Sequence, residues 1–138
     1  MVLKTREKII SGKRKTAIAK VRITEGTGKI FYNRLPHTEL HLFHKLSLSE
    51  PIRIYQSEIG GSLNYDFYIK TFGGGKEGQI QAARLAIAKA LLHLTHSDVL
   101  KKAFIKYERN LIVQDSRRKE TRKPGDSKAR AKRQKSYW

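Results

Sequence analysis

The chain has 138 residues, enough for one domain with a single hydrophobic core. Its 30 lysines and arginines against 12 acids give a formal net charge of +18, which indicates a negatively charged partner: nucleic acid, an anionic membrane surface or an acidic protein. No apolar run approaches the roughly 18 residues that cross a bilayer, and the absence of cysteine excludes disulfides and thiolate metal sites. Because residues 1–8 also lack the apolar core of a secretory signal, we expect a cytoplasmic protein with no membrane partner.

The first half of the chain predicts mainly strands. Residues 16–24 alternate in the manner of a half-buried strand with a basic outer face: Ala17, Ala19, Val21 and Ile23 on one side, Lys20 and Arg22 on the other. A turn at Gly26-Thr27-Gly28 connects this strand to a returning strand at 29–33. Three further elements are expected in this order: a short helix at 36–46 begun by a proline, and strands at 52–55 and 65–72.

The second half changes to the period of a helix. From about Gly78 to Thr95 one apolar stripe recurs at spacings of three and four: Ile80, Ala83, Ile87, Ala90, Leu91 and Leu94. A second helix is expected from Asp98 to Tyr107, capped by Ser97 or Asp98, and residues 111–113 predict a last short strand. The elements together predict a single α+β domain.

The positive charge is concentrated at the two ends of the chain. Residues 1–22 carry a net charge of +7 and residues 116–138 a net charge of +8, whereas the long middle segment carries only +3. Like-charge blocks usually stay extended in isolation and often bind nucleic acid. We therefore expect a basic N-terminal arm at 1–12, a globular domain at 13–115 and an extended basic tail at 116–138.

The segment Gly73-Gly74-Gly75-Lys76-Glu77-Gly78 matches the G-x-G-x-x-G pattern of dinucleotide-binding folds. That fold requires a second parallel strand after the helix, ending in an acid, but here another helix follows. The Walker A pattern also fails, because no Gly-Lys-Ser/Thr is present. We interpret the segment as a tight strand–helix turn whose N–H groups can approach an RNA phosphate, with nucleotide binding as the alternative.

Metal binding and catalysis find little support in the sequence. His37, His41 and His44 could share a helical face, but the segment is not H-E-x-x-H and no fourth ligand is evident. Solvated or RNA-facing histidines are the preferred interpretation. The scattered acids form no evident catalytic pair, and we expect them to make internal salt bridges: Asp66, Glu77, Asp98, Glu108 and Asp115. We therefore expect a protein without enzymatic activity, cofactor or metal.

The two basic ends carry the functional signal. Their long cations alternate with small or polar residues in three runs: Ser11 to Lys15, Arg117 to Lys119 and Lys128 to Lys135. Arginine matches phosphate oxygens with a planar fork, and the terminal rings of Tyr137 and Trp138 can stack on bases. The alternatives are a solubilising tail and a free-standing basic protein that packs nucleic acid or has antimicrobial activity.

Three motifs resemble the universal family of the ninth small-subunit ribosomal protein. They are Gly12-Lys13-Arg14-Lys15-Thr16-Ala17-Ile18-Ala19, then Gly73 to Gln79 running into Ala82 to Leu91, and finally Asp115 to Glu120 with Ala129 to Tyr137. Together they span nearly the whole chain. The ending Gln134-Lys135-Ser136-Tyr137 is similar to the archaeal and eukaryotic branch, and the short N-terminus favours an archaeal member.

The resemblance implies a fold similar to the second domain of the fifth small-subunit protein, with a four-stranded sheet packed against two to three helices. It implies a structural constituent of the small ribosomal subunit that binds the 3′ major domain of the rRNA in the head, beside neighbouring head proteins. The protein would not form homo-oligomers. The tail would thread through rRNA, and its last residues would touch the anticodon stem-loop of the P-site tRNA.

The motifs and the basic runs assign the site residues. Expected rRNA contacts in the globular domain are Lys13, Arg14, Lys15, Lys20, Arg22, Gly74, Gly75, Lys76, Gln79 and Arg84. Those in the tail are Arg117, Arg118, Lys119, Arg122, Lys123, Lys128, Arg130, Lys132 and Arg133. The expected tRNA contacts are Lys135, Ser136, Tyr137 and Trp138.

Two positions depart from the family pattern. Family members usually end in a basic residue, whereas this chain ends in Trp138, whose indole can stack but cannot form a bidentate phosphate contact. Asp126 also places an acid where relatives tend to have a glycine-rich, acid-free stretch.

Overall fold

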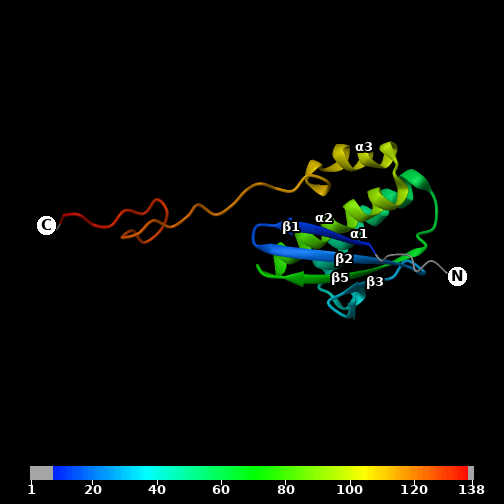
Figure 1. Ribbon diagram of the computed structural model, residues 1–138, viewed down its shortest axis with the longest axis horizontal. Helices are drawn as coiled ribbons and strands as arrows, with labels where there is room; N and C mark the ends of the chain where they lie inside the picture. Colours follow the sequence, from blue (N-terminus) through cyan, green and yellow to red (C-terminus); the bar gives the residue numbers. More distant parts are fainter. Residues whose placement is uncertain (1–7, 137–138) are drawn as a thin grey trace.

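The computed structural model describes residues 8–136 and shows one α+β domain of two layers with a long C-terminal tail (Figure 1). The sheet has five strands in the order β1-β2-β5-β3-β4. Their bounds are β1 Ile9–Arg14, β2 Ala17–Glu25, β3 Ile30–Tyr32, β4 Leu35–Pro36 and β5 Tyr65–Phe72. Three α-helices and two 3₁₀ helices complete the fold: α1 Leu42–Ile59, α2 Lys76–Thr95, α3 Asp98–Tyr107, and 3₁₀ turns at His37–Glu39 and Arg109–Leu111. The α+β prediction is confirmed.

The strand pairing follows from the connections. Tight turns join β1 to β2 and β3 to β4, and these pairs are antiparallel, as is the pair β2/β5. In contrast, β3 and β5 are parallel, because α1 crosses over between them. The order places β5 at the centre of the sheet, beside β2 and β3.

The core lies between the sheet and α2. On β2 the residues Ala17, Ala19 and Val21 are buried, as their alternation predicts, and they face α2. The facing side of α2 is rich in small buried residues: Ala82, Ala83, Ala86 and Ala90. Small side chains on both layers let helix and sheet pack closely.

Both predicted helices of the second half are confirmed. The α2 helix begins at Lys76, two residues before the expected start, and five members of the predicted stripe are buried: Ile80, Ala83, Ile87, Ala90 and Leu91. In α3 the Ser97 side chain caps the helix by accepting a hydrogen bond from the Leu100 N–H at 3.3 Å. These elements needed no tertiary information, because their apolar spacing and cap are local.

The strand predicted at 52–55 is wrong, because these residues belong to α1. Leu48 and Pro51 are fully buried, and Ile52 and Tyr55 are partly buried, so the contacts follow the spacing i, i+3, i+4, i+7 of a helix. Pro51 lies inside the helix and conceals this stripe in the sequence, since proline usually marks a helix start or a break. The helix expected at 36–46 has the wrong bounds: a 3₁₀ turn covers His37–Glu39, and the α-helix begins at Leu42 and continues to Ile59.

The number of strands also differs from the prediction. The predicted sheet of four strands lacks β1, which begins at Ile9 inside the stretch assigned to the N-terminal arm and pairs with β2 from Ile9 to Arg14. It also lacks the short edge strand β4. Residues 111–113 form no strand; Leu111 ends a 3₁₀ turn and is the last fully buried residue of the described part of the chain. Within the described residues, no helix is sufficiently long and apolar to span a membrane.

Candidate nucleic-acid interface

The C-terminal tail leaves the domain as an extended chain (Figure 1). Apart from turns near Gly125, residues 116–136 contain no helix or strand. Most tail side chains are exposed; Arg117, Arg130 and Lys132, for example, expose 75%, 86% and 68% of their side chains. Tyr137 and Trp138, two of the predicted tRNA contacts, lie outside the described residues.

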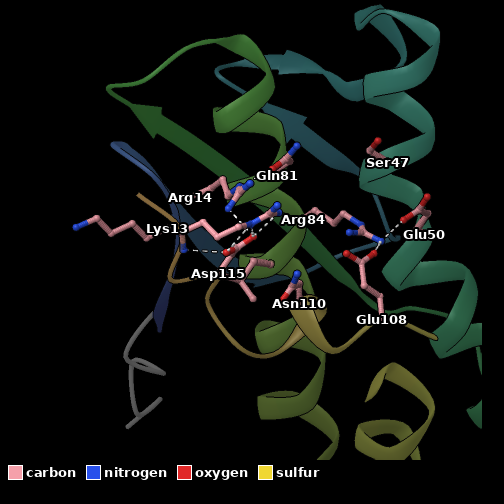
Figure 2. A pocket seen from close by; sticks show the side chains of 11 residues that line it. Lys13, Arg14, Ser47, Glu50, Gln81, Arg84, Glu108, Asn110 and Asp115 are labelled. Atoms are coloured by element: carbon pink, nitrogen blue, oxygen red, sulfur yellow. Dashed lines mark hydrogen bonds and ion pairs between the residues drawn. The ribbon is translucent and has the colours of Figure 1, made fainter. Parts of the chain in front are cut away.

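The root of the tail is fixed to the domain by Asp115 (Figure 2). Its carboxylate pairs with Arg14 of β1 and, at 2.8 Å, with Arg117 of the tail. The hydrogen bonds from the Arg117 side chain and backbone N–H lower the pKa of Asp115 to about 2. The guanidinium of Arg118 also donates to the Lys15 carbonyl in the β1–β2 turn. Two ends of the sequence that lie a hundred residues apart therefore meet where the tail begins.

Arg84 of α2 lies in the same polar pocket but serves the fold. Its guanidinium pairs with Glu50 of α1 and with Glu108, at 2.8 Å, after α3 (Figure 2). Burial opposes its charge, yet the hydrogen bond to Glu108 and the carboxylate of Glu50 outweigh this and raise the pKa of Arg84. Only 16% of the side chain is exposed, as is 14% of the Arg14 side chain. These two arginines already have carboxylate partners, so the structure gives both a role in joining elements.

The glycine segment forms the turn between β5 and α2, as expected. Gly73 and Gly74 have φ of 65° and 61°, and a Cβ on Gly74 would lie 2.8 Å from the Ala17 side chain. The Gln79 side chain donates to the Gly73 carbonyl at 2.9 Å and so closes the turn. After α2 the chain continues into α3 rather than into a parallel strand, so the context of a dinucleotide fold is absent. Gly74, Gly75 and Lys76 remain exposed beside the helix N-terminus.

The histidines and acids make local contacts. His44 hydrogen-bonds Glu77 at 2.8 Å, His41 caps α1, and the described residues contain no group of three metal-ligating side chains. Glu108 and Asp115 form the salt bridges expected of them. Asp66 instead accepts hydrogen bonds from three backbone N–H groups, of Thr27, Gly28 and Lys29, and so holds the β2–β3 turn.

The predicted contact residues fall into three regions. Lys13 and Lys15 lie at the β1–β2 turn, close to the glycine turn, with which Lys15 lines a cavity of about 220 Å³. Lys20 and Arg22 project from the sheet face that α2 does not cover. Apart from Arg14, Lys76 and Arg84, described above, the other predicted cations follow the tail. Three of these have acidic partners: Arg117 with Asp115, Arg130 with Glu120, and Lys132 with Asp126.

Three residues of the candidate interface could not be recognised from the sequence in the roles that the structure gives them. Asp115 is recognised there only as an acid in a salt bridge, whereas the structure makes it the anchor of the tail. Asp126, a departure from the family pattern, organises a turn by accepting from the Arg133 N–H at 3.1 Å. Lys70 lies opposite Lys20 on the neighbouring strand, and only the register of β2 and β5 could reveal this.

The comparisons with known proteins agree on one family. A family model described as ribosomal protein S9/S16 matches residues 12–138. The small ribosomal subunit protein uS9 of Methanococcus vannielii is 45% identical over 129 residues, which cover 91% of this chain and 94% of the relative. The protein of the same name from Methanothrix thermoacetophila is 41% identical over 128 residues, with 92% and 95% covered. The chain therefore belongs to the ribosomal protein S9/S16 family, and it is of the archaeal type.

Proposed function

We propose that this protein binds small-subunit rRNA in the head of the ribosomal subunit and that its C-terminal tail reaches the anticodon stem-loop of the P-site tRNA. Family membership makes the chain a structural, non-enzymatic component of the cytoplasmic ribosome. The curated relatives are named as small-subunit proteins, and this supports the same subunit for the present chain.

One observation carries the proposal: a strongly cationic tail extends away from a domain in which the long segment 23–115 carries a net charge of only +3 (Figure 1). The tail holds ten lysines and arginines against two acids. Such a chain gains little by folding on itself, because its charges repel each other and it has no apolar stripe to bury. A polyanion removes both obstacles, since each neutralised phosphate releases counterions.

The anchor at Asp115 supports separate roles for the folded domain, which would dock on rRNA, and for the end of the tail, which would reach tRNA. Because Asp115 links Arg14 and Arg117, the tail leaves the domain at a fixed point and in a fixed direction. We propose that the folded domain and the residues near this anchor dock on rRNA of the 3′ major domain, among the neighbouring head proteins. The distal residues 133–138 then remain to contact tRNA, and the docked protein is a single copy.

Deletion of residues 133–138 tests the proposal. We expect the truncated protein to enter small subunits as the full chain does, because the anchor and the cations from Arg117 to Lys132 remain. P-site tRNA should dissociate faster from subunits that carry it. A matched variant, with Arg133 and Lys135 replaced by glutamine at unchanged length, separates charge from reach. If the truncated protein sediments free of subunits, the proposed division is wrong.

A further inference from the structure

The sheet face opposite α2 presents a row of side chains across all five strands. Strand register places Ile9, Arg22, Tyr68, Phe31 and Pro36 side by side, one from each strand in the order of the sheet. At the centre of this row the rings of Tyr68 and Phe31 are stacked, with centroids 5.0 Å apart and planes within 9°. Such a ring pair outside the core is not needed to hold the two layers together.

Cations surround the rings. The Arg22 guanidinium lies 4.9 Å from the centroid of Tyr68, on the side away from Phe31, because β2 and β3 flank β5. One step along the same strands, the amino groups of Lys20 and Lys70 lie 5.7 and 5.3 Å from the centroid of Phe72. Phe72 is itself 42% exposed. The Arg22 guanidinium and the rings of Tyr68 and Phe31 thus follow one another across the sheet. Lys20 and Lys70 lie beside them.

The stacked rings of Phe31 and Tyr68 line an open groove of about 530 Å³. Four cations line it with them: Lys20, Arg22, Lys70 and, from the β3–β4 turn, Arg34. Among residues 8–136, none of those that line this groove is acidic. Ile9, at its rim, is 61% exposed. An aromatic floor with only positive charge around it is complementary to a ligand that is both flat and anionic.

We propose that this face binds an unpaired stretch of RNA, with a nucleobase stacked against the Phe31–Tyr68 pair and the adjoining phosphates on Lys20, Lys70 and Arg34. Proteins that hold single-stranded RNA use this combination, because every base has a face to stack and every nucleotide a phosphate. A duplex is excluded, since its bases are stacked on each other. The inference rests on the proposed rRNA binding and deepens it by assigning single-stranded RNA to this face.

Crosslinking of the wild-type chain tests the location directly. The probe is a 12-nucleotide unstructured RNA that contains 4-thiouridine, mixed with the full-length protein at about 200 mM salt, where phosphate contacts of the tail weaken. We expect crosslinked peptides that contain Phe31 or Tyr68. Crosslinks confined to residues 116–136 would overturn the inference and leave the proposed rRNA binding intact. The proposed function itself fails separately, if the wild-type chain does not bind small-subunit rRNA at all.

Variants test the stacking. Phe31→Leu and Tyr68→Leu keep an apolar side chain and remove the ring, and each should weaken binding of the single strand by roughly 5- to 150-fold. Binding of a duplex of the same length should change by less than about twofold. Tyr68→Phe keeps the ring and should bind as the wild type does, and Phe43→Leu, at a 70% exposed ring on α1, is the control.

The remaining outcomes are also decisive. Equal losses for single strand and duplex, or no loss for either, would contradict stacking. If a leucine variant does not melt cooperatively, the wild-type crosslinks and the variants Lys20→Gln and Lys70→Gln test the inference instead. Each lysine variant should lose more affinity for the single strand than for the duplex. Crosslinks in native subunits that join this face to another protein would show a protein occupant and overturn the inference.

Discussion

The substitution Gly12→Ala tests whether β1 packs directly on α2, the contact that brings the N-terminal strand into the domain. A Cβ on Gly12 would lie 2.3 Å from the Ala82 carbonyl oxygen and 2.8 Å from the Ala86 nitrogen. Both are backbone atoms in the middle of a buried helix, so the added methyl group is accommodated only if the strand and helix separate. Overpacking of this kind costs typically 1–3 kcal/mol, and we expect about 3 kcal/mol here.

Urea unfolding followed by far-ultraviolet circular dichroism measures the effect. A loss of about 3 kcal/mol corresponds to a decrease in Tm of roughly 10–20 °C for a domain of this size. Gly61→Ala is the matched control, because it makes the same chemical change where no atom of the described residues lies within 4 Å of the added Cβ. It should alter the free energy of unfolding by less than about 1 kcal/mol. A Gly12→Ala protein as stable as the control would refute the close packing of β1 on α2.

Three further predictions follow from the ion pairs and turns. Asp66→Ala removes the acceptor of three backbone N–H groups and should cost about 1–3 kcal/mol in urea unfolding, whereas Asp66→Asn, which keeps one oxygen, should cost less. Arg84→Gln should lower stability by about 1–2 kcal/mol and leave rRNA affinity within about twofold, because this arginine serves Glu50 and Glu108; a large affinity loss at unchanged stability would contradict that role. The Asp115 carboxyl should titrate near pH 2 in carbon-detected NMR and shift toward 3.8 in Arg117→Gln. Since its folded-state pKa is the lower one, its contact stabilises the tail anchor above pH 3.8 and loses that effect as the pH falls toward 2.

Elements with a sustained local pattern could be predicted from the sequence. The stripe of α2, the Ser97 cap of α3 and the alternation of β2 each specify their structure within a few residues. Residues 52–55 could not be assigned correctly, because three of these four residues after a proline are β-branched or aromatic and so resemble a strand until the burial of Leu48 and Pro51 is known. β1 escaped prediction because its cations and Gly12 resemble an unstructured basic arm, and only pairing with β2 defines it.

The composition of the site was predicted better than its connections. Sequence motifs single out the basic residues, and the tail is indeed exposed and extended. They do not reveal that Arg14 and Arg84 have carboxylate partners, since Asp115 and Glu50 are supplied by distant parts of the chain. They also miss the Phe31–Tyr68 stack, which exists only because β3 pairs with β5 in parallel.

The salt dependence of rRNA affinity tests the central claim most directly. The affinities of the full chain and of a chain ending at residue 115 for an rRNA fragment of the 3′ major domain are measured from about 50 to about 300 mM salt. Over this range the affinity of phosphate contacts falls measurably with salt. Seven of the ten tail cations form no ion pair within the described residues. The plot of log affinity against log salt should therefore be steeper for the full chain by roughly 5–6 units, at 0.7–0.9 per phosphate contact. Equal slopes for the two proteins would show that the tail neutralises no phosphate and would contradict the account.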